Sequence, residues 1–240
     1  MKGRRRARRT ALFAAAVLFC LVLAACGWMR NRRAAEWYRP IAAVAMPYEH
    51  VLVLGSAAAA HELLRNRAAE DVDLVMAEKP LFLPVSARLH SYTEDPFQYL
   101  AEREKHYDFI LVALAPPRTA AENRAYTNLF YRMCANHLNE GGVLAVETVS
   151  PEAFPAAYRC IALTLKSEGL AVQQFALAEG KKPARGVFFA APEAGKLVLP
   201  ADTPLQRVKE VTGAEVPPVG VNRLSRPLLL DYLEEKEKTK

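Results

Sequence analysis

The sequence feature that most constrains the fold is a short apolar run that ends at a single glycine. Residues 50–54 read His-Val-Leu-Val-Leu, Gly55 and Ser56 follow, and residues 57–64 consist of alanine, leucine, glutamate and histidine. Aliphatic runs of this length are typical of buried parallel strands, whereas alanine and leucine favour a helix. The pattern predicts the first strand, turn and helix of a parallel α/β sheet. In such sheets the turn after the first strand is where a nucleotide-like ligand binds.

The rest of the domain alternates strand and helix patterns. Thr119-x-x-Glu122 has capping-box spacing, and Ser150-Pro151 has the pattern of an N-cap followed by proline at the first helical position. Alternation that ends in a β-hairpin predicts an α/β fold with a Rossmann-like sheet of the S-adenosylmethionine-methyltransferase type. Strands are predicted at 51–54, 72–76, 88–92, 107–114, 143–146, 171–178 and 186–190, and helices at 41–45, 58–67, 95–104, 119–138, 150–167, 204–212 and 228–236.

The positive net charge of +6 is concentrated at one end of the chain. Residues 1–33 hold nine of the 32 basic side chains and no acidic one, so the remainder carries 23 basic against 26 acidic side chains. Nucleic acids are held mainly through basic contacts to phosphate. A mildly acidic domain therefore argues against nucleic acid as a partner.

The N-terminal segment has the pattern of an export signal. A dense basic run at residues 2–9 precedes an apolar stretch at residues 11–25, which ends in Leu-Ala-Ala before Cys26 and Gly27. A charged region followed by a short apolar region is typical of signal peptides. The end of the stretch resembles the lipobox of bacterial lipoproteins. That resemblance implies that Cys26 is lipidated and becomes the new N-terminus.

An uncleaved anchor helix is the alternative for this segment. With residues 27–29 included, the apolar run approaches the ~20 residues that span a bilayer. More basic residues precede the run than follow it, which favours a domain outside the cytoplasm. Both interpretations attach the protein to a membrane through its N-terminus, and we favour the lipoprotein. The predicted organisation is a signal peptide with lipobox (or an anchor helix) at 1–26, a tether at 27–47 and one domain at 48–240.

Residues with metal-binding or nucleophilic chemistry form no motif in this sequence. Cys134 and Cys160 lie far apart in apolar helical patterns, so both are predicted to be small buried hydrophobic residues. The five histidines show no i, i+4 pair. Cysteine pairs at metal-ligand spacing, phosphate-binding loops and nucleophile elbows do not occur, and no metal site is predicted.

The order of motifs resembles the catalytic domain of spermidine synthases, the polyamine aminopropyltransferases. The best-matching parts are residues 107–112, 126–131, 138–146 and 150–151, and residues 199–202 and 221–224 resemble a tail found in bacterial members. The resemblance implies binding of decarboxylated S-adenosylmethionine and transfer of its aminopropyl group to an amine. No counterpart of the family's N-terminal β-domain is expected, because only the predicted tether precedes the first strand.

The loop after the first strand departs from the family pattern. The family has a glycine-rich, acidic loop there, which lets the backbone approach the cofactor. In this chain Gly55 and Ser56 are the remaining candidates for cofactor contacts, and four alanines follow them at residues 57–60. Each added Cβ obstructs close approach of the backbone, and positive φ is disfavoured for such residues. We expect a weakened nucleoside site at this turn.

Two acidic residues are further candidates for nucleoside contacts. Met76 stands where the family has an acidic residue for the ribose hydroxyls, and Glu78 is a substitute two residues later. Asp95 matches the family's adenine-contacting aspartate. It is equally well interpreted as the N-cap of a helix that begins at Pro96.

The catalytic positions after the fourth strand differ most from the family. The family has an aspartate that removes a proton from the attacking amine and a second aspartate that holds the amine, whereas this chain has Ala113 and Pro116. General-base catalysis needs a titratable group within hydrogen-bond reach. We therefore predict no catalytic residue, and an S-adenosylmethionine-type nucleoside only if the site is functional. Tyr126 matches a position near the family's active site, but its helical pattern predicts core packing.

Three functions remain open at this point. The first is a membrane-attached spermidine-synthase-like protein that has lost the chemistry and serves in binding or scaffolding. The second is an active aminopropyl- or methyltransferase with a rearranged site that uses Glu78, Asp95 or Glu147, since methyl transfer to some acceptors needs little beyond positioning. The third is a structural envelope lipoprotein whose fold is incidental.

Overall fold

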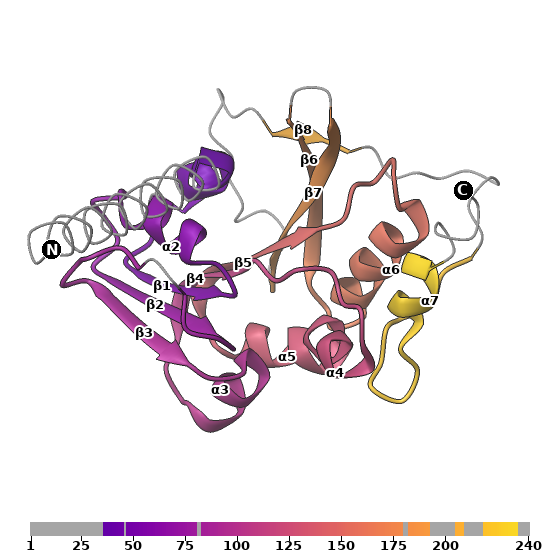
Figure 1. Ribbon diagram of the computed structural model, residues 1–240, viewed down its shortest axis with the longest axis horizontal. Coiled ribbons are helices and arrows are strands. Elements are labelled where there is room, and N and C mark those ends of the chain that lie inside the picture. The colour runs from indigo at the N-terminus through magenta and orange to yellow at the C-terminus, as the bar shows by residue number, and fades with distance from the viewer. Residues whose placement is uncertain are drawn as a thin grey trace, which may run out of the picture.

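A single mixed sheet organises the part of the chain that the structure describes. The computed structural model describes residues 36–45, 47–80, 83–179, 182–192, 205–208 and 218–234. The sheet has the strand order β3-β2-β1-β4-β5-β7-β6-β8 (Figure 1). The strands are β1 (His50–Leu54), β2 (Asp71–Met76), β3 (Leu89–Thr93), β4 (Tyr107–Val112), β5 (Leu138–Thr148), β6 (Ala171–Glu179), β7 (Lys182–Ala191) and β8 (Gln206–Arg207).

The first five strands run parallel, and the last three are antiparallel to their neighbours. β1 lies between β2 and β4, so residues 51–54 have hydrogen-bonded neighbours on both sides and are fully buried. This burial on both faces explains why the strand is a continuous aliphatic run. The structure confirms the predicted α/β fold with a mostly parallel sheet, and β6 and β7 form the predicted hairpin.

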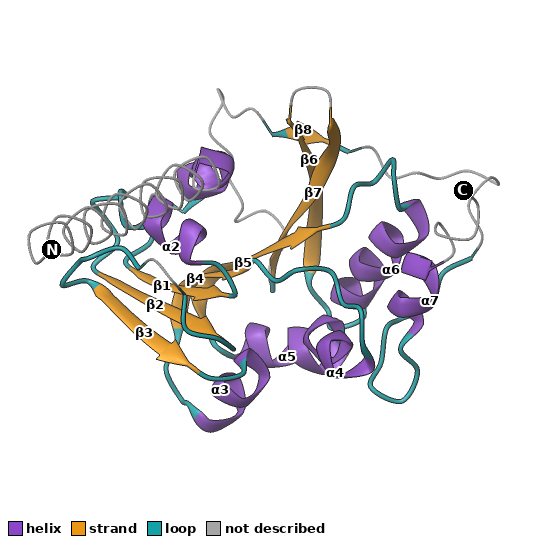
Figure 2. Ribbon diagram, viewed as in Figure 1, coloured by secondary structure: helices purple, strands orange, loops and turns teal. Residues whose placement is uncertain are grey.

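Helices cover both faces of the sheet (Figure 2). One apolar core lies between the sheet and two helical stretches, residues 36–44 and α2 (Ala57–Leu63). The second core lies on the opposite face under α3 (Pro96–Glu102), α5 (Asn128–Asn136) and α6 (Pro155–Lys166). The remaining elements are α4 (Ala120–Asn123), the 3-10 turn η1 (Arg124–Tyr126) and α7 (Leu228–Glu234). Cys134 and Cys160 are buried free thiols in the second core, as predicted.

The long helix predicted at residues 119–138 is divided into three pieces. Thr119 caps α4 by accepting a hydrogen bond from the Glu122 N–H, but the Glu122 carboxylate accepts from the Arg118 N–H rather than completing a capping box. Thr127 leaves helical geometry and caps α5 through its own side chain. Leu138, predicted at the helix end, already belongs to β5. The apolar period continues across the break, which is why the sequence pattern did not reveal it.

Two further predicted helices differ from the structure, one at its start and one in its type. The Ser150 side chain accepts from the Ala153 N–H and closes a turn, and α6 begins only at Pro155, where proline occupies the first helical position. The helix predicted at residues 204–212 is contradicted by the short strand β8, and its remainder lies outside the described residues. Cys26 and the whole predicted signal or anchor segment also lie outside them. Within the described residues, no helix has the length and apolarity of a membrane span.

The turn that leaves β1 depends on Gly55. Its backbone has a positive φ of 97°, and its N–H donates to the carbonyl oxygen of Val75 at 2.9 Å. A Cβ at this position would lie 2.5 Å from the Leu114 side chain and 2.9 Å from the Ala113 carbonyl oxygen. Glycine is therefore required here by backbone conformation and by space together.

We predict that Gly55→Ala destabilises the protein more than Gly169→Ala. Gly169 also has a positive φ, 78°, but a Cβ there would meet open space. The Gly169 variant should lose about 1–2 kcal/mol through backbone strain alone. The Gly55 variant should lose a further ~1–3 kcal/mol because its methyl group overpacks the turn. Urea unfolding of both variants measures the difference, and equal losses would contradict the steric argument.

Candidate functional site

Two adjoining cavities lie at the carboxyl ends of the parallel strands. The first, of about 650 Å³, is lined by residues at the ends of β1, β4 and β5, and we call it the β5 cavity. The second, of about 980 Å³, extends towards α3 and α4, and we call it the α3 cavity. They share a wall made of residues 114–117, Tyr126, Ala153, Phe154 and Leu233. Ligands of open α/β sheets bind at this edge, so the two cavities form the candidate site.

The polar part of the β5 cavity is built around one carboxylate, that of Glu147. Glu147 is near the end of β5 and only 9% exposed. Its Oε2 accepts a hydrogen bond of 2.7 Å from the Tyr38 hydroxyl, and its Oε1 accepts one from Nη1 of Arg185. Both carboxylate oxygens are therefore engaged by donors from other segments of the chain.

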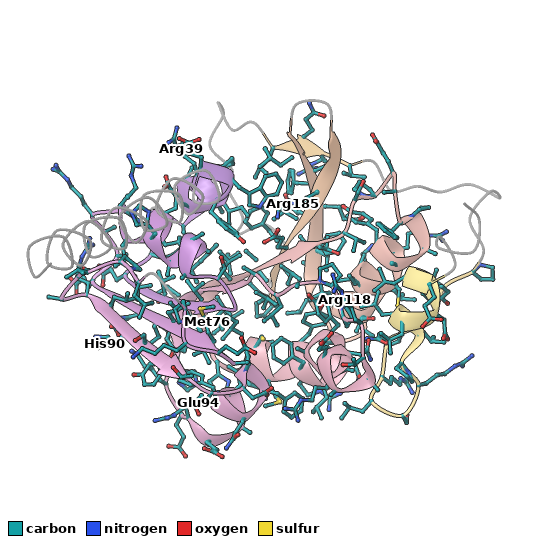
Figure 3. All side chains as sticks on the ribbon, in the orientation of Figure 1. Arg39, Met76, His90, Glu94, Arg118 and Arg185 are labelled. Carbon is teal, nitrogen blue, oxygen red and sulfur yellow. The ribbon has the colours of Figure 1, made fainter. Side chains whose placement is uncertain are left out.

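Arg185 and Tyr38 are themselves held in place by packing. Arg185 lies on β7 (Figure 3), and its guanidinium carbon lies 3.9 Å from the centroid of the Trp37 ring. Trp37 and Tyr38 belong to the helical residues 36–44 and are both buried. Burial, and then the negative charge of Glu147, raise the pKa of Tyr38, so its hydroxyl stays a proton donor at neutral pH.

Gly55 and Ser56, the candidates for cofactor contacts at this turn, both line the β5 cavity. Ser56 is the N-cap of α2, and its hydroxyl oxygen accepts from the Ala59 N–H at 3.2 Å. The alanines at 57–60 are buried in the first core rather than facing the cavity. The side chain of Leu114 packs against Gly55 and occupies the space beside the turn.

β4 is followed by Ala113 and Pro116, neither of which is titratable. Ala113 is buried and lines the β5 cavity, and Pro116 lies in the wall shared by both cavities. Val112 pairs with Val146 across β4 and β5, so Glu147 is the strand neighbour of Ala113. Within the described lining of the β5 cavity, Glu147 is the one carboxylate.

Asp95 and Glu78 occupy different surroundings. Asp95 lines the α3 cavity and caps α3, where Oδ1 accepts from the N–H groups of Phe97 and Gln98. Its Oδ2 forms an ion pair of 2.8 Å with Arg124. Glu78 is exposed after β2 and does not appear in the lining of either cavity. Gly55 and Ser56 thus line the β5 cavity, Asp95 lines the adjoining α3 cavity, and Glu78 lines neither.

Tyr126 does more than pack in the core. It is 2% exposed, and its hydroxyl lies 2.8 Å from the Leu114 carbonyl oxygen and 2.7 Å from that of Ala115. Burial raises the pKa of Tyr126, which keeps the hydroxyl protonated as the donor to these carbonyls. Tyr126 therefore fixes the loop that forms the shared wall of the two cavities.

Sequence reasoning missed Tyr38 and Arg185 as site residues. Tyr38 falls in the stretch interpreted as a tether, and Arg185 falls in the predicted terminal hairpin. The available signal was Glu147 itself, because a glutamate within the apolar run 143–149 must find a donor or cation when it is buried. That signal predicts that a partner exists but does not say which one.

Comparison with known proteins identifies the domain. Residues 84–175 match the spermine/spermidine synthase domain family. The chain is 30% identical over 139 residues to the polyamine aminopropyltransferase of Oceanobacillus iheyensis, which covers 51% of this chain and 27% of that protein. It is 26% identical over 223 residues to polyamine aminopropyltransferase 1 of Streptomyces coelicolor, which covers 81% of this chain and 42% of that protein. The chain contains a spermidine synthase family domain.

Solved spermidine synthases share the fold of this domain. A spermidine synthase in complex with the transition-state analogue AdoDATO superposes with a TM-score of 0.56 at 14% identity, over 70% of this chain and 61% of that one. The spermidine synthase of Thermotoga maritima superposes with a TM-score of 0.54 at 15% identity, over 67% of this chain and 60% of that one. The curated relatives above are matched over less than half of their length.

We predict that the Glu147–Arg185 pair is coupled energetically. Arg185→Leu leaves the buried carboxylate with Tyr38 alone and should cost about 1–3 kcal/mol, less than for a fully buried pair because the Arg185 side chain is 41% exposed. The double variant Glu147→Leu/Arg185→Leu should be more stable than Arg185→Leu, since it leaves no unpaired charge. Urea unfolding of the wild type, the two single variants and the double variant gives the free energies of unfolding that make up this double-mutant cycle.

Arg207→Leu is the matched control for this cycle. Arg207 lies on β8, packs over Phe175 and donates to Gln173 at the surface. Its loss should change stability by no more than ~0.5 kcal/mol. If the losses of stability in Glu147→Leu and Arg185→Leu add up to the loss in the double variant, the two side chains are not coupled.

Proposed function

We propose that this protein is a membrane-attached, non-catalytic binding or scaffold member of the spermidine synthase family. The observation that carries the proposal is the pair Ala113 and Pro116 at the end of β4, where the family resemblance expects two aspartates. Neither side chain accepts a proton or balances a cationic amine, so the amine acceptor of an aminopropyl transfer has no base there. The neighbouring carboxylate, Glu147, already receives hydrogen bonds on both oxygens.

The nucleoside side of the cleft supports the same conclusion. Leu114 packs against Gly55, where close approach of a cofactor to the backbone would be needed. Asp95 uses one oxygen as a helix cap and the other for Arg124, so an adenine contact must displace an ion pair. Glu78 lines neither cavity. These three arrangements oppose tight binding of an S-adenosylmethionine-type nucleoside.

An active transferase with a rearranged site is the second candidate. The observation that favours it is the position of Glu147, which neighbours Ala113 across β4 and β5 and faces the same cavity. Relatives of the chain are named polyamine aminopropyltransferases, and a spermidine synthase of the same fold binds the analogue AdoDATO. In this interpretation Glu147 accepts a proton on a lone pair that Tyr38 and Arg185 leave unused, and its protonation weakens the ion pair with Arg185.

The test between the two candidates is aminopropyl transfer by the full-length chain. With decarboxylated S-adenosylmethionine and putrescine, we expect spermidine at no more than the no-enzyme rate, because no free base faces the cleft. Calorimetry should show no binding of methylthioadenosine or S-adenosylmethionine tighter than millimolar, which corresponds to about −4 kcal/mol.

A polyamine aminopropyltransferase such as that of Streptomyces coelicolor serves as positive control for the transfer assay. Turnover by this chain above background, lost in Glu147→Gln and kept in Arg207→Gln, would establish the second candidate and remove the first. Micromolar affinity for either nucleoside would contradict the argument from Gly55 and Leu114.

We propose in addition that Cys26 carries the membrane attachment and that the domain lies outside the cytoplasm. The support is the sequence before it, a basic run and an apolar stretch that end at Leu-Ala-Ala-Cys. Each buried lipid methylene contributes ~0.8 kcal/mol, and stable attachment takes more than one acyl chain, so a multiply acylated cysteine suffices as an anchor.

Labelled palmitate should therefore enter the wild-type protein, and the intact mass should correspond to residues 26–240 plus lipid. Cys26→Ser should abolish labelling and leave a longer precursor, whereas Cys20→Ser, which changes the apolar stretch outside the lipobox, should leave both unchanged. A wild-type chain that keeps its basic N-terminus and takes up no palmitate would support the anchor helix instead.

A further inference from the structure

We propose that the β5 cavity binds a small molecule with an apolar body and a single carboxylate, and that the carboxylate pairs with Arg185. The inference rests on the proposed non-catalytic function and names the class of ligand for the same cleft. A site for cationic amines attracts positive charge, whereas the proposed site attracts negative charge. The argument depends on which charges line the cavity, which of them are already paired, and what covers the remaining wall.

The charged side chains in the described lining of the β5 cavity are Glu147 and Arg185, one of each sign. A site that holds a diamine must supply negative charge for each ammonium group. Here the one carboxylate is already neutralised, and a cation that approaches it meets the Arg185 guanidinium as well. An incoming ammonium group is opposed by Arg185, and an incoming carboxylate is opposed by Glu147, so the charge preference of the cavity depends on which partner has hydrogen-bonding groups to spare.

Hydrogen-bond capacity favours the carboxylate. The two oxygens of Glu147 accept from Tyr38 and Arg185. Among the described residues, Arg185 has one hydrogen-bond acceptor, Glu147, which it reaches through Nη1. A guanidinium carries five N–H donors in a fixed plane, and the remaining donors of Arg185 have no acceptor in the described lining. Arg185 thus has more unused donors than Glu147 has unused lone pairs, which favours a ligand that brings acceptors.

The position of Arg185 suits it to this role. Stacking over Trp37 and the bond to Glu147 fix the plane of the guanidinium, and the side chain keeps 41% of its surface exposed. Figure 3 shows Arg185 beside β7. A fixed guanidinium loses little conformational freedom when it binds a planar carboxylate, and such charge-assisted bonds are about twice as strong as neutral ones.

The rest of the lining fits an apolar body. Leu114, Pro117, Phe154, Ile161, Leu229 and Leu233 contribute to the wall, and they come from the β4 loop, the turn before α6, α6 itself and α7. A volume of about 650 Å³ lies within the range of small-molecule sites, which are mostly apolar with a few fixed polar groups. The cavity thus offers one cationic contact at the edge of a hydrocarbon surface.

The test compares three probes with the same body, 4-phenylbutyrate, 4-phenylbutanamide and 4-phenylbutylamine, on the full-length chain by calorimetry. We expect the carboxylate to bind about tenfold more tightly than either other probe. Arg185→Gln should remove this preference. Glu147→Gln should strengthen carboxylate binding several-fold, because it removes the negative charge beside Arg185.

Two further variants keep the result interpretable. Glu147→Gln/Arg185→Gln has no unpaired buried charge and should also show no preference, so a folding defect in Arg185→Gln does not decide the outcome. Arg207→Gln, an arginine outside the cavity, should bind the carboxylate as the wild type does. Equal or tighter binding of the amine or amide, an unchanged preference in both Arg185 variants, or no binding of any probe would overturn the proposal. None of these results bears on the transfer assay, which tests the proposed function separately.

Discussion

The candidate site depends on the two hydrogen bonds that Tyr38 and Arg185 donate to the buried carboxylate of Glu147. A charge that is removed from water destabilises a protein unless donors surround it. Here the donors come from residues 36–44 and from β7, which are distant from β5 in the sequence. The need to satisfy one side chain thus holds a helix, a parallel strand and the terminal hairpin against one another. It also determines which polar groups face the β5 cavity and which are already used.

The same contacts also bear on whether Glu147 can act as a general base. A general base must have a lone pair available to the substrate, and it must give up its present partners without leaving another charge unpaired. Glu147 keeps lone pairs beyond those that Tyr38 and Arg185 use, but protonation of its carboxylate leaves the Arg185 guanidinium without its ion-pair partner. The domain keeps the sheet of the spermidine synthase family, and its function depends on the residues that line the cleft and not on the fold alone.

Much of the fold could be predicted from the sequence because strands buried on both faces are mostly apolar, with the buried Asp73 of β2 as an exception. β1, β2 and β4 were found in this way, and of the two interpretations of Asp95 that the sequence left open, the helix cap before Pro96 is confirmed. The break at Thr127 was missed because the apolar face of the helices continues across it. The partners of Glu147 were missed for another reason. The Tyr38 contact spans 109 residues and the Arg185 contact depends on the pairing of β5 with β7, so neither has a local sequence signature.

The loop fixed by Tyr126 gives the cleft a property that neither cavity has alone. Residues 114–117 form one wall of both cavities, and a single hydroxyl holds the carbonyls of Leu114 and Ala115. A ligand that displaces this wall from one side changes the volume available on the other. Occupancy of the two cavities is then thermodynamically linked, and the linkage is reciprocal: whatever one ligand does to the affinity for a second, the second does equally to the first.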